Sequence, residues 1–322
     1  MSTVSFEEFT YLSSDGRTNV HAYTWAPTGQ KPLAIVQLSH GMCEYVQRYD
    51  AWARRFAEKG IVFCGNDHLG HGHTAPDSEE LGYTAPQNGA EYLVEDLHTM
   101  TLHMRERYGD DVPLILYGHS MGSFVARLYL TRFGHDLAGA ILSGTAGPEQ
   151  PTALALALTK FLKKMKGDRH RSRFLTALAF GAYNKKFKKE HDHCSWLTSE
   201  TDVRSAYASD PFCTFVFTLS GYETLFSLLG AVSAKCWAEQ VPKHLPILLL
   251  SGDADPVGNY GRGVKKIYHR LQNAGANVTL KLYKNGRHEM HNEKEKELVF
   301  EDVLNFIAQI PMPLTKENEE IL

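Results

Sequence analysis

Short apolar runs alternate with amphipathic helical patterns along this chain, and that alternation limits the folds open to it. Between these runs, residues 49–60 and 90–109 carry apolar side chains at spacings of three and four. Runs that are apolar throughout form strands buried on both faces, as in a parallel sheet. The sequence therefore predicts an α/β fold, a mostly parallel sheet with helices on both faces, after an antiparallel hairpin at 7–27 that turns at Asp15 and Gly16. The strand-like runs lie at 33–39, 60–66, 113–118, 137–144 and 246–252.

One segment interrupts the alternation. Residues from 146 to about 240 are helical in pattern, until the apolar run at 246–252 resumes the sheet. A chain of 322 residues is long enough for one large domain with an inserted subdomain. We therefore expect an α/β core made of residues 1–145 and 241–322, with a helical cap, or lid, inserted at 146–240.

The predicted cap is strongly basic. From Lys160 to Glu190 there are eleven Lys and Arg against Asp168 and Glu190, a balance of +9, whereas the whole chain carries -3. One interpretation is an ordinary solvated face of surface helices. The other is a lid that contacts a lipid interface, because the apolar stretches ALALALTKFL and FLTALAFGAY lie beside the charge.

Composition narrows the class of protein. The hydrophobic content of 43% and the small net charge are ordinary for a soluble globular protein, and nothing points to nucleic acid. The N-terminus lacks the pattern of a signal peptide, and no window approaches eighteen uncharged apolar residues. Five cysteines without CxxC spacing do not suggest a disulfide framework. We expect a cytoplasmic protein, peripheral to membranes if the cap is interfacial.

The stretch Gly118-His119-Ser120-Met121-Gly122 follows one predicted strand and precedes a helical pattern, FVARLYLTRFG. A G-x-S-x-G sequence in that context is typical of a nucleophile elbow, a turn so sharp that only glycine fits on either side of the serine. The alternative is a serine that caps a helix. The sequence favours Ser120 as a nucleophile.

A serine hydroxyl reacts only when a base takes its proton and a carboxylate orients that base. In this arrangement the acid and then the histidine follow the serine along the chain, in loops after later strands. The loop in LLLSGDADPVG favours Asp255, with Asp253 as the alternative. After the strand VTLKLY, the loop KNGRHEMHNE favours His288, with His291 as the alternative.

Two backbone amides are expected to stabilise the oxyanion of a tetrahedral intermediate. One belongs to the residue after the nucleophile, Met121, and the other to the loop after the third strand, LSHGMCEYVQRY. The pair His40-Gly41 lets the chain turn inward, so that the Met42 amide can face the substrate.

The motifs SHGMCEYVQRY, NDHLGHGHT, GHSMGS, WLTSETDVRSAYASDPFC, SGDADPVG and GRHEMHNE together resemble the monoacylglycerol lipase and lysophospholipase group of α/β-hydrolases, which is also catalogued with serine aminopeptidases. The resemblance runs from about residue 7 to 310. It implies an eight-stranded sheet, a helical cap after the sixth strand, no cofactor, and hydrolysis of small acyl esters of lipid metabolism through an acyl-enzyme. Ser120, Asp255 and His288 fall on the catalytic triad of the group, and Met42 and Met121 on its oxyanion hole.

Some alternatives stay open. The run Asp67, His68, His71 and His73 and the stretch HDHC at 191–194 could suggest a metal, but we interpret both as loops. The basic cap would also suit an acyl-thioesterase, because the phosphates of a nucleotide carrier could bind to its positive charges. An aminopeptidase would need carboxylates in the cap to hold a free amine, whereas this cap is basic. A ligand receptor without catalytic activity would be expected to lack a triad residue, whereas all three are present here.

Overall fold

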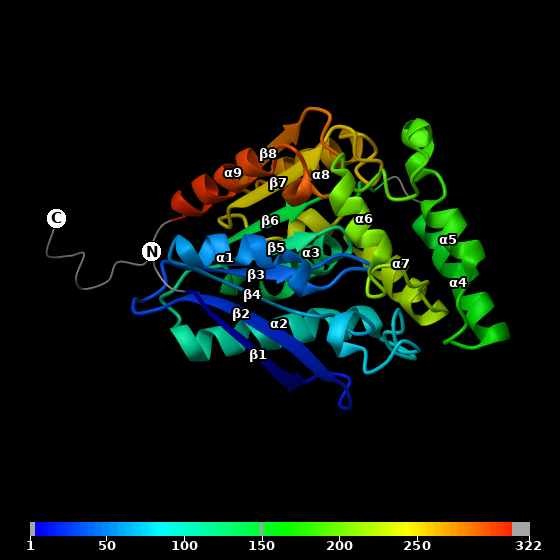
Figure 1. Ribbon diagram of the computed structural model, residues 1–322, viewed down its shortest axis with the longest axis horizontal. Coiled ribbons are helices and arrows are strands. Elements are labelled where there is room, and N and C mark those ends of the chain that lie inside the picture. The colour runs from blue at the N-terminus through cyan, green and yellow to red at the C-terminus, as the bar shows by residue number, and fades with distance from the viewer. Residues whose placement is uncertain (1–3, 149–150, 311–322) are drawn as a thin grey trace, which may run out of the picture.

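Eight strands form one sheet in the computed structural model, which describes residues 4–148 and 151–310 (Figure 1). Their order is β1-β2-β4-β3-β5-β6-β7-β8. The strands β3 to β8 run parallel to one another, while β1 and β2 pair antiparallel with their neighbours. The mostly parallel sheet predicted from the apolar runs is confirmed. The strands are β1 Val4–Leu12, β2 Asn19–Pro27, β3 Ala34–Ser39, β4 Ile61–Asn66, β5 Leu114–His119, β6 Gly139–Ser143, β7 Ile247–Gly252 and β8 Val278–Tyr283.

The first two strands form the predicted hairpin, and the turn is where the sequence placed it. Gly16 has a φ of 75°, in the region that glycine enters without strain. The Asp15 carboxylate accepts the backbone N–H groups of Arg17 and Thr18, both at 2.8 Å. An aspartate that satisfies backbone donors ahead of it is a standard way to close a turn.

Helices cover both faces of the sheet. On one face α1 (Asp50–Glu58) and α9 (Lys296–Ala308) bury Trp52, Phe56 and Phe300 against the strands. On the other face lie α2 (Gly89–Tyr108), α3 (Met121–Phe133) and α8 (Arg262–Asn273). The faces are separate apolar clusters, as expected when each strand is buried on both sides.

Between β6 and β7 the chain leaves the sheet. It forms α4 (Thr152–Lys166), α5 (Arg173–Phe180), α6 (Thr201–Ser209) and α7 (Leu219–Ser233), with 3-10 helices at Tyr183–Glu190 and Trp237–Gln240. Figure 1 shows α4 and α5 at the outer edge of the molecule, with α6 and α7 between them and the sheet. We keep the name cap for residues 146–240. Residues 149–150 of the cap, and residues 1–3 and 311–322 of the core, lie outside the described residues.

The loop after β4 contains the histidine-rich run. Asp67 is buried there, and its carboxylate accepts the N–H groups of Val46 and His73 at 2.8 and 2.9 Å and the hydroxyl of Tyr23 at 3.2 Å. These bonds join three segments of the core, which is the loop-structuring role predicted for the run. Within the described residues, no helix is both long enough and apolar enough to cross a membrane.

Candidate active site

Ser120 lies at the sharp turn between β5 and α3. Its φ is 52° and its ψ is −120°, a strained backbone for a residue with a Cβ. The two flanking glycines are required by space: a Cβ on Gly122 would lie 1.9 Å from the carbonyl oxygen of Ser39, and one on Gly118 would lie 2.7 Å from the Cβ of Ala126. The chain therefore has the backbone geometry of a nucleophile elbow at the predicted position.

The structure brings Asp255, rather than Asp253, against a histidine. His288 Nδ1 lies 3.0 Å from Asp255 Oδ2, and both side chains are buried. The other oxygen of Asp255 accepts the N–H of Val257 at 2.8 Å, which orients the carboxylate. Asp253 is exposed and accepts the N–H of Asn285 at 2.7 Å, so it supports the turn.

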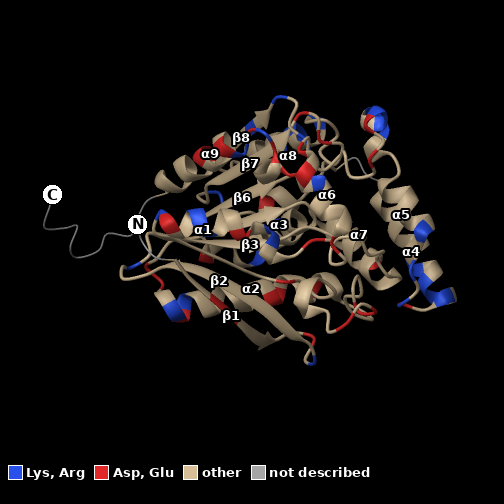
Figure 2. Cartoon of the chain, viewed as in Figure 1, with Lys and Arg blue, Asp and Glu red and all other residues tan. Residues whose placement is uncertain are grey.

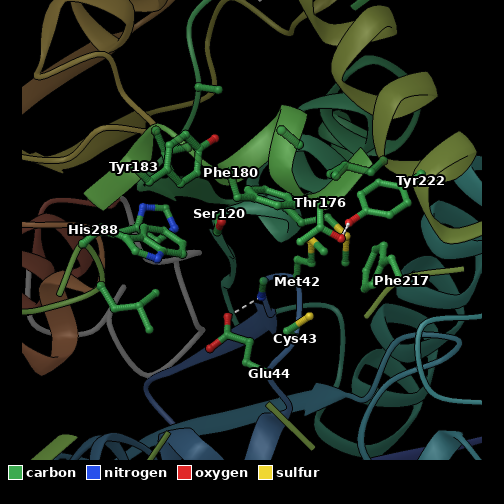
Figure 3. Close-up of a pocket in the computed structure, with 18 of the residues that line it drawn as sticks. Met42, Cys43, Glu44, Ser120, Thr176, Phe180, Tyr183, Phe217, Tyr222 and His288 are labelled. Atoms are coloured by element: carbon green, nitrogen blue, oxygen red, sulfur yellow. Dashed lines mark hydrogen bonds between the residues drawn. The ribbon is translucent and has the colours of Figure 1, made fainter. Parts of the chain in front are cut away.

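The environment of His288 suits a general base. Burial lowers the pKa of His288, but the Asp255 carboxylate, together with Glu289 and Glu44, more than offsets this, so that the pKa is raised above its ordinary value. His288 Nε2 is buried and accepts no hydrogen bond from the described residues. The imidazole lines the same pocket as Ser120, as Figure 3 shows. Nε2 is thus the ring nitrogen that has no partner among the described residues and remains able to bond to another group.

His291, the alternative histidine, lies elsewhere. Its ring is buried and stacks on Tyr49 with ring centroids 4.4 Å apart. It belongs to the 3-10 helix Met290–Asn292 and does not line the pocket. Burial lowers the pKa of His291 to about 3, so the ring is neutral and behaves as a core side chain.

The loop after β3 places Gly41 and Met42 next to the serine. A Cβ on Gly41 would lie 3.0 Å from the Cβ of Ser120, so this loop approaches the elbow closely. The N–H of Gly41 donates to the Glu44 carboxylate, the bond drawn in Figure 3. Met42 and Met121 both line the pocket beside Ser120. The two residues predicted for the oxyanion hole are therefore brought together around the serine.

A buried ionic network supports this loop. Arg48 donates to Glu44 at 2.9 Å and, through both terminal nitrogens, to Glu289 at 2.9 and 3.0 Å. Burial and the second carboxylate raise the pKa of Glu44 to about 7, whereas Arg48 holds the pKa of Glu289 well below its usual range. The network joins the loop after β3 to the residue that follows His288.

A pocket of about 570 Å³ opens above Ser120, between the core and the cap. Near Ser120 the pocket touches the polar side chains of His119, Glu44 and Glu289, and the hydrogen-bonded pair Thr176 and Tyr222 of the cap lines it as well (Figure 3). Most of the remaining wall is apolar, and most of these apolar residues come from the cap. Apolar lining residues include Phe124, Leu178, Ala179, Phe180, Phe215, Phe217, Leu225, Phe226, Leu229 and Val257.

Several residues of the site were not predicted individually. Glu44, Arg48 and Glu289 lie within the motifs SHGMCEYVQRY and GRHEMHNE, but nothing in their spacing indicated that they would meet. Trp196 of the cap lies against His288, with ring centroids 5.0 Å apart. One signal in the sequence could have indicated the ionic network. Charged residues stand close to the predicted triad residues, and a charge that becomes buried there needs a partner.

Comparisons with known proteins agree with this geometry. The family model described as serine aminopeptidase, S33 matches residues 30–295. The chain is 27% identical to a monoacylglycerol lipase of Mycolicibacterium smegmatis over 88% of its own length and 91% of that protein. It is 26% identical to the human monoglyceride lipase, over 95% of this chain and 92% of that one.

A solved structure is also similar along nearly the whole chain. A thermostable carboxyl esterase from Bacillus coagulans, solved with glycerol, superposes with a TM-score of 0.89 at 33% identity, covering 96% of this chain and 99% of that one. The resemblance to monoacylglycerol lipases that the motifs predicted is thereby confirmed. With the family model matching most of its length, the chain belongs to the serine aminopeptidase S33 family of α/β-hydrolases.

Proposed function

We propose that this protein is a serine hydrolase that cleaves carboxylic esters of monoacyl lipids, of the monoacylglycerol or lysophospholipid type. The observation that carries the proposal is that Ser120, on a strained elbow, and the buried His288–Asp255 pair meet at one largely apolar pocket. The names of the relatives, lipases and a carboxyl esterase, support the same class of reaction.

The mechanism follows from the groups present. His288 Nε2 takes the proton of Ser120 as its oxygen attacks the ester carbonyl, and Asp255 holds the ring and stabilises the imidazolium. The Met42 and Met121 amides stabilise the oxyanion. His288 then donates the proton to the leaving alcohol, which gives an acyl-Ser120 ester. Water, activated by the same imidazole, attacks this ester and releases the fatty acid.

The pocket favours a lipid substrate with a single acyl chain. A volume of about 570 Å³ is in the range of sites for small organic ligands. The apolar wall from the cap suits a hydrocarbon chain, while the polar groups near the serine suit the alcohol part of the ester. A free amine has little to bind at that end, because both carboxylates there already pair with Arg48.

The outer face of the cap supports contact with a lipid surface. Exposed apolar side chains lie on α4 and α5: Leu154 (72% exposed), Phe161 (60%), Met165 (68%) and Phe174 (63%), with Leu178 (58%) exposed where it also lines the pocket. Figure 2 shows Lys and Arg at the far end of α4 and in the segment after α5. Exposed apolar side chains together with clusters of basic ones are typical of an interfacial helix, and the basic side chains complement anionic headgroups.

The reaction is tested by substituting the nucleophile. Ser120→Ala should abolish hydrolysis of p-nitrophenyl butyrate and of a monoacylglycerol while leaving the thermal midpoint of unfolding nearly unchanged. A fluorophosphonate should label Ser120 in the unsubstituted protein and nothing in the variant. A panel that adds lysophospholipids, acyl-thioesters and aminoacyl amides would then identify the preferred acyl donor and leaving group. Near-normal turnover by Ser120→Ala would refute the proposal.

The lipid contact is tested by reversing charge in the cap. Lys185, Lys186, Lys188 and Lys189 are all exposed, but Lys186 packs over the ring of Tyr260 at 3.3 Å and should be left in place. Replacing the other three lysines by Glu should weaken binding to vesicles of phosphatidylcholine and phosphatidylglycerol, an effect that salt screens. Turnover of a short soluble ester serves as the control and should be retained. Equal vesicle binding before and after the change would exclude this role.

A further inference from the structure

His288 lies in a loop with little regular structure of its own. The loop begins after β8 ends at Tyr283 and continues to Glu293, with only the short 3-10 helix Met290–Asn292 inside it. A catalytic imidazole must be held within a fraction of an ångström, so such a loop needs support from elsewhere. Asp255 fixes one nitrogen of the ring, but it does not fix the backbone that carries it.

Arg287, directly before His288, reaches into the cap. Its guanidinium donates to both oxygens of Glu190, at 3.0 and 2.6 Å, and to the carbonyl oxygens of Ser195 and Thr198, at 2.5 and 3.3 Å. The side chain is only 12% exposed. A planar guanidinium with two parallel bonds to one carboxylate holds a defined orientation, unlike a lone ammonium group.

Residues after His288 are held by the same part of the cap. The N–H of Glu289 donates to the carbonyl oxygen of Leu197 at 2.7 Å. The buried carboxylate of Glu293 accepts the N–H of Arg287 and the N–H of Ser199, both at 3.0 Å, and the Ser199 hydroxyl at 2.6 Å. Glu293 thus connects the residue before His288 to the end of the loop and to the cap.

The cap residues that make these contacts are held in place by a second arginine. Arg204, on α6, lies 3.1 Å from Glu190 and 2.6 Å from Asp192, and it donates to the Thr198 carbonyl at 2.9 Å. The segment from Glu190 to Ser199 is therefore held as a unit by a buried arginine. We refer to the contacts of Glu190, Leu197 and Ser199 with Arg287, Glu289 and Glu293 as the cap–loop clasp.

We infer that the cap–loop clasp positions His288, with Arg287 and Glu293 as positioning residues, so that the proton transfer depends on the cap even for substrates too small to contact the acyl wall. The inference rests on the proposed function and adds a second role to the cap. The contacts lie on both sides of His288 in the sequence, at Arg287 and at Glu289, so loosening them lets the imidazole shift relative to Ser120 and Asp255.

The test is Arg287→Lys, assayed on p-nitrophenyl acetate. Lysine keeps the positive charge but cannot reproduce the paired bonds to Glu190 together with those to the two carbonyl oxygens. We expect kcat to fall about tenfold or more, since misplacement by about 1 Å can cost a hundredfold, while KM stays nearly constant. The far-downfield proton resonance of His288 Nδ1–H should broaden or disappear, which reports the His288–Asp255 contact independently of turnover.

A second variant approaches the clasp from the cap. Glu190→Gln should give a smaller fall in kcat in the same direction, and combining it with Arg287→Lys should give less than the sum of the two losses, because the Arg287–Glu190 contact is common to both changes. Arg55→Lys is the matched control: Arg55 makes the same paired bonds, at 3.0 and 2.7 Å, to Glu297 on the core surface, and its loss should leave kcat unchanged.

The outcomes separate the inference from the proposed function. Unchanged kcat and an unchanged His288 resonance in both clasp variants would overturn the inference, as would a loss confined to KM. If Ser120→Ala retains turnover, the proposed function fails, and the His288 resonance still decides whether the clasp positions the imidazole.

Discussion

Replacing His71 by phenylalanine should make the protein less sensitive to acid. The His71 ring is fully buried, and its edge faces Phe215 and Phe217 at centroid distances of 5.6 and 5.4 Å. Nδ1 bonds to the Leu69 carbonyl at 3.0 Å, whereas Nε2 has no partner among the described residues. Burial lowers the pKa of His71 from 6.5 to about 4. A second proton on this ring would have to be buried among aromatic side chains.

The sign of the effect follows from where the proton binds. Below pH 6.5 the unfolded chain binds a proton at this histidine and the folded chain does not, so the free energy of unfolding falls as the pH drops from about 6.5 toward 4. At pH 5, with these two pKa values, the loss attributable to His71 is about 2 kcal/mol relative to pH 7.5. Phenylalanine does not titrate, so this part of the loss should vanish.

Buried groups whose pKa does not depend on His71 change the overall pH dependence but cancel in the comparison. Burial raises the pKa of Asp67 to about 6 and of Glu44 to about 7, and these carboxyl groups act in the opposite direction, since the folded chain keeps their protons. Comparing the variant with the unsubstituted protein at two pH values removes both contributions. Four more imidazoles have a pKa lowered chiefly by burial: His40, His68, His119 and His291.

The assay is urea unfolding at pH 7.5 and at pH 5.0, with the free energy of unfolding taken from the midpoint and slope. His71→Phe should lose about 2 kcal/mol less than the unsubstituted protein between these values, whatever its stability at pH 7.5. His269→Gln, at an exposed position on α8, is the control, because its side chain stays in water in both states. Parallel losses in His71→Phe and the unsubstituted protein would refute the reasoning.

Three further outcomes are expected. Asp255→Asn should lower kcat by about a thousandfold or more by misorienting the imidazole, whereas Asp253→Asn, in an exposed turn, should be mild, and steady-state kinetics will rank the two. Gly122→Ala should lower the free energy of unfolding by about 3 kcal/mol or more, measured in urea, since the new Cβ would lie 1.9 Å from the Ser39 carbonyl. The raised pKa of His288 predicts that kcat/KM rises with pH through a value above 6.5, because the neutral imidazole is the base, and a midpoint below 6.5 would contradict this.

Much of the fold could be predicted from local patterns. The runs at 113–118 and 246–252 became β5 and β7, because a continuous apolar run has no face to expose and pairs in the middle of a sheet. The elbow at Ser120 could also be predicted, because the sharp turn leaves no room for a Cβ on either side of the serine and the sequence has glycine at both positions. The order of serine, acid and histidine then limited the acid and the base to two candidates each.

Tertiary structure was needed to choose between those candidates. Asp253 and Asp255 are two residues apart in one loop, and only the path of that loop over the end of β7 turns Asp255 toward His288 and leaves Asp253 in water. The same holds for His291, whose ring the fold packs against Tyr49. Residue type and spacing are nearly identical within each pair, so the local pattern could favour one candidate by its place in the loop but could not show which side chains meet.

The sequence by itself determined the sheet, the elbow and the family, because apolar periodicity, glycine sterics and contiguous motifs act over short stretches of chain. Only the folded chain decided which distant groups meet. Arg287 and Glu190 are separated by 97 residues, and Arg48 and Glu289 by 241, yet each pair is joined by two parallel bonds. Such pairs form where burial removes water and leaves one partner within reach, and burial is a property of the assembled structure.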